Sequence, residues 1–179
     1  VRGQPLPASL GPATGTRLIS FTTTEGTNLS FDLSPDRRWI VLDLLGQLWR
    51  IPGEGGRATA LTDAVADAAE DVDPIVSPDG AWIAFQGDRN NVEGLWLMPA
   101  GGGVPRLLPG TEASVRVRWK TYFRPAWSRD SRHIAFIRDG RAFLHRLASD
   151  STTALPLENP VSGVLQSIDW LPDGRLLLF

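Results

Sequence analysis

The sequence holds few side chains that could carry out a reaction. It has two histidines, His133 and His145, and no cysteine among its 179 residues. A zinc site needs three or four clustered nitrogen, sulfur or oxygen ligands, and neither HxH nor HExxH occurs here. No serine lies in a G-x-S-x-G frame, which marks many hydrolase nucleophiles. We expect no catalytic residue, no zinc site and no cofactor in this chain, although a longer parent protein could still be an enzyme.

Four aspartates recur at nearly even intervals of 43, 51 and 43 residues, namely Asp36, Asp79, Asp130 and Asp173. In the second copy the aspartate follows Ser77 and Pro78 and precedes Gly80, which is a strong turn sequence. An aspartate in such a turn can accept hydrogen bonds from nearby backbone N–H groups. We therefore expect these carboxylates to form turns, and we do not expect them to share a ligand.

Each turn leads into short apolar segments that predict strands. The run that follows the turn recurs at 39–42, 82–85, 133–136 and 176–179. A third element follows in the first three units, at 48–52, 95–99 and 143–147, and a fourth in the first two, near 57–62 and 104–108. Four short antiparallel strands in about 43 residues are typical of one blade of a β-propeller.

We therefore predict an all-β partial β-propeller with about three and a half blades of four antiparallel strands. The first blade should have strands near 30–34, 38–43, 47–52 and 57–62. The expected organisation is an extended leader at 1–15 and a propeller at 16–179, with 16–24 as an outer strand of a later blade and blades near 28–62, 71–108, 122–157 and from 165. Such a chain would be an N-terminal portion of a longer protein.

Charge is unevenly distributed along the chain. The net charge is only −2, yet residues 54–93 hold nine acidic residues against two arginines. Residues 114–146 hold nine basic residues against two acidic ones. The basic part supplies a candidate interaction surface of Arg116, Arg118, Trp119, Lys120 and Arg124. The slightly acidic chain has no nucleic-acid-binding module and no apolar run of the roughly 18 residues that a membrane helix needs, so we expect neither nucleic acid nor a membrane span.

Two acidic residues and the tryptophans offer weaker signals. Asp71 and Asp73 open the first strand of the second blade, where carboxylates near the central channel could hold calcium. Arg124 has the position of Asp73 in the third blade, so an internal ion pair is an equal alternative. Most of the seven tryptophans recur at matching repeat positions and are expected in the core, with Trp119 as the exception.

The second unit carries a resemblance to a known family. It contains Ser77 to Gly80, Trp82 to Phe85, Leu95 to Met98 and Gly101 to Leu108 in succession. This series resembles the TolB-like propeller repeat, and the match covers roughly residues 28–179. The third unit departs from it, because Arg129 replaces the proline and Ser131 replaces the glycine.

The segments 16–27 and 43–49 are similar to the N-terminal propeller of bacterial secreted amidohydrolases. In that group the metal ligands lie in a separate catalytic barrel. The resemblance implies a periplasmic or secreted protein in which this segment is a scaffold or interaction surface. Its partner would be another protein or a downstream catalytic domain.

Two rival functions stay open, a free-standing periplasmic propeller that binds proteins and the gating propeller of a serine peptidase. We also expect self-association through the open blade faces. The sequence after Phe179 would distinguish these functions, because barrel histidines, a G-x-S-x-G motif and an early stop each favour a different one.

Overall fold

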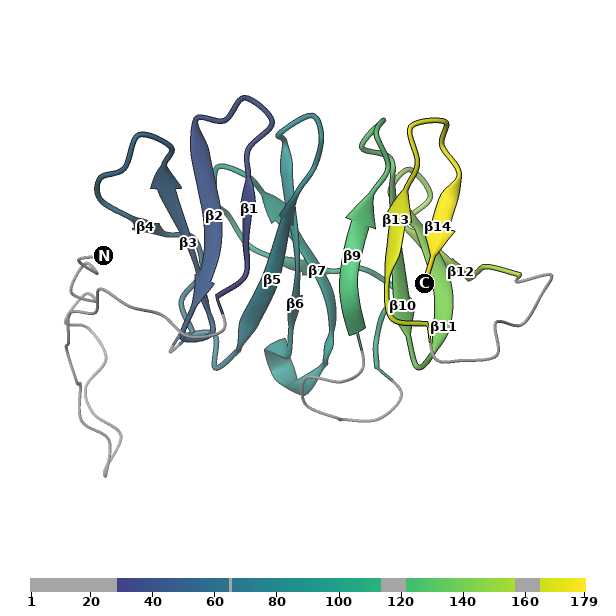
Figure 1. Ribbon diagram of the computed structural model, residues 1–179. Coiled ribbons are helices and arrows are strands. Elements are labelled where there is room, and N and C mark those ends of the chain that lie inside the picture. Colours follow the sequence, from purple (N-terminus) through teal and green to yellow (C-terminus); the bar gives the residue numbers. More distant parts are fainter. Residues whose placement is uncertain (1–28, 65, 114–121, 157–164) are drawn as a thin grey trace.

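The computed structural model describes residues 29–64, 66–113, 122–156 and 165–179, and it contains four antiparallel sheets (Figure 1). The first sheet consists of β1 (Phe31–Leu33), β2 (Trp39–Leu44), β3 (Gln47–Pro52) and β4 (Thr59–Ala60). The second consists of β5 (Asp71–Val76), β6 (Trp82–Gly87), β7 (Gly94–Pro99) and β8 (Arg106–Leu107). The third consists of β9 (Tyr122–Trp127), β10 (His133–Arg138), β11 (Arg141–Arg146) and β12 (Ser151–Ala154). The fourth contains β13 (Ile168–Trp170) and β14 (Leu176–Leu178), and the 3-10 helix η1 (Arg89–Asn91) follows β6.

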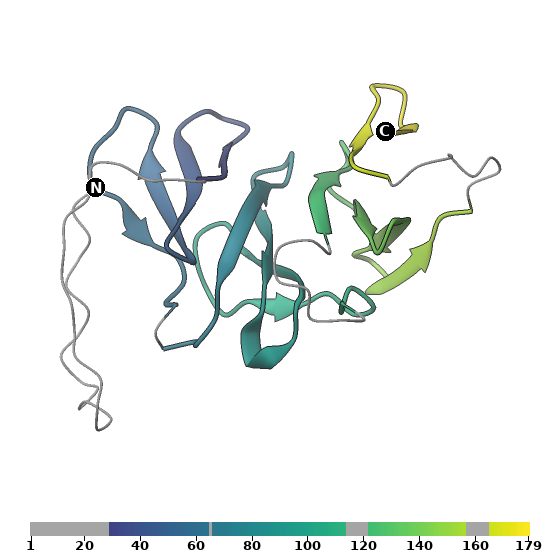
Figure 2. The same ribbon diagram turned by 60° about the horizontal axis from the view of Figure 1, so that its bottom comes forward.

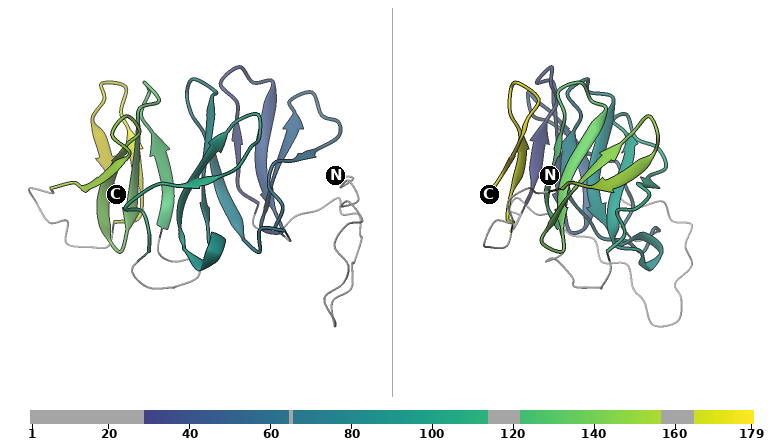
Figure 3. Two further views of the ribbon diagram at one scale, coloured as in Figure 1. Left: turned by 180° about the vertical axis from the view of Figure 1, so that it is seen from behind. Right: turned by 90° about the vertical axis from the view of Figure 1, so that its right-hand side faces the viewer.

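Within each sheet the strands follow one another in sequence order, so each sheet is one propeller blade. The first strands β1, β5, β9 and β13 form an inner row in which neighbours contact one another, and β4, β8 and β12 lie at the outer edges (Figures 1 and 2). The view from behind shows the same order of blades (Figure 3, left). The predicted all-β partial propeller is confirmed. In the first blade each predicted strand lies within two residues of the observed one.

The core lies between the blades because side chains alternate along each strand. On β6, Ile83 and Phe85 pack toward the first blade, while Ala84 packs toward the third. The side chains of β7 alternate in the same way, and Trp96 and Met98 pack toward the first blade. A middle blade therefore needs apolar residues on both faces, which explains the continuous apolar runs in the sequence.

The repeated turns have the hydrogen bonds that the sequence predicted. Ser77 Oγ donates to Asp79 Oδ1 at 2.5 Å and accepts from the backbone N–H of Trp82 at 2.9 Å. Asp79 Oδ1 also accepts from the N–H of Ala81. The Ser77 hydroxyl lowers the pKa of the Asp79 carboxyl, and corresponding serines lower the pKa of Asp36 and Asp130. These aspartates have the predicted structural role.

The inner strand of the second blade is interrupted by a bulge. Its pairing with β6 shifts between Val72 and Ile75, and Asp73 has a φ of 51°. A left-handed conformation is uncommon for a residue with a side chain. The bulge removes the Asp73 N–H from the strand ladder, so that it can reach a partner in the neighbouring blade.

Several sequence expectations concern residues outside the described ranges. These are the leader at 1–15, the additional strand at 16–24 and the place of Trp119. Of the other tryptophans, Trp39, Trp96 and Trp127 are buried in the clusters between the blades, as expected.

Candidate functional site

A polar network in and beside the inner strands joins the first two blades. Asp43, on β2, is buried and accepts hydrogen bonds from two backbone N–H groups, Ser30 at 3.1 Å and Asp73 at 2.9 Å. Ser30 Oγ donates to Asp73 Oδ1 at 2.5 Å, and Gln86 Nε2 donates to Asp73 Oδ2 at 3.0 Å. Burial raises the pKa of Asp43, while the two N–H donors oppose that shift. The network fixes the bulge against the first blade.

Arg124 extends from the third blade to the first. Its Nη2 donates to the carbonyl oxygen of Phe31 at 3.3 Å and lies 3.7 Å from Asp32 Oδ1. The other oxygen of Asp32 accepts from the N–H of Val76 in the second blade. Asp32 thus contacts both following blades. The Arg124 side chain is 57% exposed and Phe31 is 63% exposed. We call Phe31, Asp32 and Arg124 the inner-strand surface.

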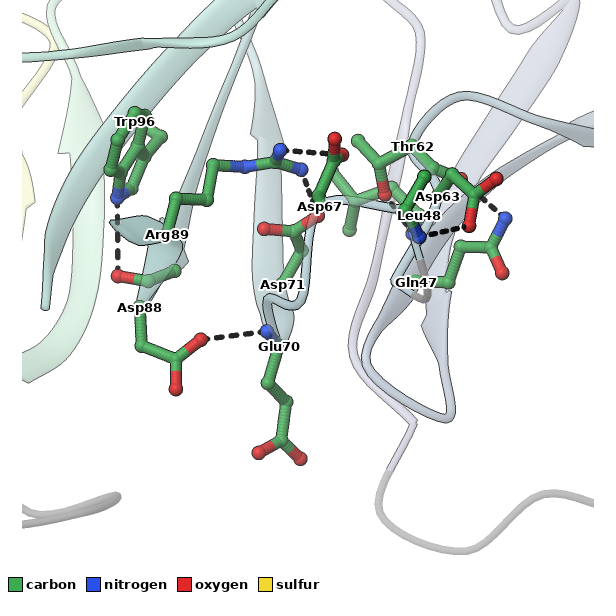
Figure 4. Close-up of polar contacts among 12 residues, drawn as sticks. Gln47, Leu48, Thr62, Asp63, Asp67, Glu70, Asp71, Asp88, Arg89 and Trp96 are labelled. Carbon is green, nitrogen blue, oxygen red and sulfur yellow. Dashed lines mark hydrogen bonds and ion pairs between the residues drawn. The ribbon is translucent and has the colours of Figure 1, made fainter. Parts of the chain in front are cut away.

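A second group of charges surrounds Arg89 at the end of β6 (Figure 4). Arg89 is buried, and its Nη1 and Nη2 contact Asp67 at 2.6 Å and Asp71 at 2.5 Å. Its guanidinium also lies 5.8 Å from the Phe85 ring centre and 5.9 Å from the Trp96 ring centre. Burial raises the pKa of Asp71, and the Arg89 charge opposes that rise. The ion pairs anchor the loop that follows β6.

That loop differs from its counterparts in the other blades. Six residues, Asp88 to Glu93, join β6 to β7, whereas two residues join β2 to β3 and two join β10 to β11. Asn90 and Asn91 are exposed and have φ values of 54° and 61°. Consecutive left-handed residues are unusual and indicate a loop conformation imposed by its surroundings.

Asp71 and Asp73 do not converge on a common site. Asp71 is fully buried beside Arg89, whereas Asp73 contacts Ser30 and Gln86. An internal ion pair is present, but the cation that pairs with Asp71 is Arg89 and Arg124 pairs with Asp32. Within the described ranges there is no group of three or more His, Asp or Glu residues that could hold a metal. Calcium takes six to eight oxygen ligands, so an ion here would need ligands from elsewhere.

The two histidines lie where the repeat places them. His133 begins β10 at the position of Trp39 and Trp82 and stands 3.7 Å from Asp130. His145, on β11, is completely buried, and burial lowers its pKa. The histidines lie on different strands, and neither belongs to a metal-binding group of described residues.

The sequence analysis identified Arg124 but missed Asp43 and Arg89. Arg116, Arg118, Trp119 and Lys120 of the candidate interaction surface lie outside the described residues. The sequence did contain a signal for Arg89, because the segment between the second and third strands is longer in the second blade than in the first and third blades. Asp43 had no such signal, because its partners depend on the bulge.

Comparisons with known proteins agree with this architecture. No family model matches the chain. It is 28% identical over 152 residues to an uncharacterized protein of Agrobacterium fabrum, covering 82% of this chain and 48% of that protein. The structure resembles TolB from Agrobacterium tumefaciens with a TM-score of 0.61 and 25% identity, covering 82% of this chain and 50% of that one. It resembles TolB from Acinetobacter baumannii with a TM-score of 0.58 and 18% identity, over 77% and 34% of the two chains.

The fold and the comparisons together define the class of this protein. It is a partial β-propeller whose structural neighbours are TolB-like propellers. The chain spans about half the length of the Agrobacterium proteins that it matches. In the part of the chain that the structure describes, no helix is long and apolar enough to cross a membrane.

Proposed function

We propose that this chain is a non-catalytic propeller segment that acts as a scaffold and protein-interaction surface. The observation that carries the proposal is the inner-strand surface, where the exposed Arg124 side chain donates to the backbone carbonyl oxygen of Phe31, whose own side chain is also exposed. Aromatic and arginine side chains are enriched at protein interfaces and often supply most of the binding energy. The carboxylates Asp43 and Asp71, by contrast, are engaged in holding the blades and a loop.

The sequence extends this proposal to the basic segment that precedes β9. Arg116, Arg118, Trp119 and Lys120 combine positive charge with an aromatic ring, as does the inner-strand surface. We propose that they belong to the same interaction surface and that the partner presents acidic groups. The partner would be a separate protein or a catalytic domain of the same protein.

The wider context of the chain is also a proposal. Its resemblance to the propellers of secreted amidohydrolases supports an amidohydrolase-like parent protein and a periplasmic or secreted location. A free-standing binding propeller and a peptidase gate are the rival proposals. The remaining sequence of a longer form of the protein distinguishes them, because only the first requires barrel histidines and only the last a G-x-S-x-G serine.

Charge reversal tests the interaction surface. We would compare the proteins retained from the producing cells by the unchanged chain, by Arg124→Glu and by Arg57→Glu, using quantitative mass spectrometry. Arg57 is exposed on the turn between β3 and β4 and serves as the matched control. The proposal predicts partners that are lost with Arg124→Glu and kept with Arg57→Glu. Identical partner sets for all three chains would contradict it.

A further inference from the structure

The outer seam between the second and third blades is joined by polar contacts of Arg106, Thr152 and Arg138, whose Nη1 donates to the carbonyl oxygens of Gly110 and Glu112. Arg106, on β8, contacts Asp150 with its Nη1 2.8 Å from Oδ1. Thr152, on β12, donates its hydroxyl hydrogen to the carbonyl oxygen of Pro109 at 2.7 Å. The backbone of Gly110 approaches closely, because a Cβ at that position would lie 3.0 Å from Thr152 Cβ. The seam is therefore tightly packed around Thr152.

His145 lies directly behind these contacts. Its side chain is fully buried, and Nδ1 is 3.0 Å from Thr152 Oγ1. Since the Thr152 hydroxyl hydrogen points to Pro109, Thr152 Oγ1 must accept a hydrogen from His145 Nδ1. The neutral ring therefore carries its proton on Nδ1. Its Nε2 then carries a lone pair and has no hydrogen-bond partner within the described ranges. Asp150 Oδ1 lies 3.5 Å from this nitrogen.

Protonation would change this arrangement at one atom. A proton on Nε2 gives His145 a second donor, directed at the same Asp150 oxygen that Arg106 already contacts. Asp150 and Arg106 are the charged groups that face the ring. The strand neighbours of His145 are uncharged, Ile134 on β10 and Thr152 on β12. The charge of Asp150 favours this proton, but burial of the ring opposes it more strongly and the charge of Arg106 opposes it as well, so the protonated ring is unfavourable here.

We propose that His145 makes the seam between the second and third blades sensitive to acid, with the neutral ring holding the seam closed and the protonated ring weakening it. Burial lowers the pKa of His145, and this sets the direction in which stability changes with pH. An unfolded histidine binds a proton near pH 6.5, whereas the folded one resists until a lower pH. The contribution of His145 to the stability of the folded state is therefore fully present above about pH 6.5, and it declines as the pH falls toward the pKa of the folded state.

Hydrogen exchange of the full chain tests the proposal between pH 7.5 and 5.5. After correction for intrinsic exchange, we expect the opening constant of the β12 amides to increase by up to about tenfold per pH unit inside this window. His145→Asn keeps a donor for Thr152 but cannot titrate, so it should abolish the increase. His133→Asn changes the other histidine and should keep it. An equal acid response in wild type and His145→Asn would overturn the proposal.

Direct titration keeps the test valid if His145→Asn does not fold. The NMR signal of the His145 ring can be assigned with the His133→Asn variant, which has only one histidine. The proposal requires a titration midpoint below that of an ordinary histidine. A midpoint at or above the ordinary value would overturn it.

Discussion

Ser30 and Asp73 occupy the same position in consecutive blades, 43 residues apart, and their side chains are hydrogen-bonded to each other at 2.5 Å. The repeat thus places two equivalent residues in contact across the seam between the first and second blades. Asp43 completes the link by accepting from the backbone N–H of both residues. The cohesion of this seam therefore depends on polar side chains in and beside the inner strands as well as on the apolar clusters.

Asp43→Ala should destabilise the protein by about 2–4 kcal/mol, because two N–H groups would lose a charged acceptor at a buried site. Urea unfolding followed by circular dichroism measures this change. Asp169→Ala is the control, since Asp169 is exposed and, among the described residues, its side chain bonds only the N–H of the next residue. The control should stay within about 0.5 kcal/mol of wild type. Equal losses for the two variants would refute the bridging role of Asp43.

Arg89→Leu should cost about 3–5 kcal/mol at neutral pH, because it leaves Asp71 buried without its cation. The loss should shrink in acid. Without Arg89, burial raises the pKa of Asp71 further, so the folded state holds a proton that the unfolded state has released, and stability rises as the pH falls through the folded pKa. Unfolding at pH 7.5 and 5 checks the sign. Adding Asp71→Asn to Arg89→Leu should recover part of the loss at pH 7.5, and no recovery would contradict the assignment.

Two equivalent turn positions should respond differently to substitution by glycine. Arg37 and Ser131 both have a φ of 59°, at the position that is Gly80 in the second blade. Arg37→Gly should stabilise the protein by up to about 1 kcal/mol by removing side-chain strain. Ser131→Gly should give no such gain, because Ser131 Oγ accepts from the N–H of Asp79 in the adjacent blade. Thermal unfolding separates them, and the same change in Tm for both would contradict the argument.

Self-association should depend on Phe31. Phe31 and Leu33 are exposed, whereas the corresponding Pro74 and Val76 in the second blade are buried. Light scattering should show a mass that rises with concentration, and Phe31→Ser should reduce that rise. Val104→Ser, on the turn between β7 and β8, should not change it. A strict monomer at all concentrations would rule out this interaction.

Much of the fold could be predicted from the sequence because its signals are local. The turn around Asp79 contains its own hydrogen-bond partners within five residues, so the turn can be recognised without knowing the rest of the chain. The contacts of Asp43 and Arg124 join residues that are 30 and 93 positions apart. These contacts follow from blade stacking and from the bulge at Asp73, and neither has a local sequence signature.

Site-specific photo-crosslinking in the cells that produce the protein tests the proposed interaction surface most directly. A benzoylphenylalanine in place of Phe31 puts the reactive group on the inner-strand surface, and the same residue in place of Val104 is the control. We predict a defined crosslinked protein from position 31 that disappears when Arg124→Glu is added, and no such product from position 104. The same products from both positions, or a product from position 31 that is unaffected by Arg124→Glu, would contradict the proposed interaction surface.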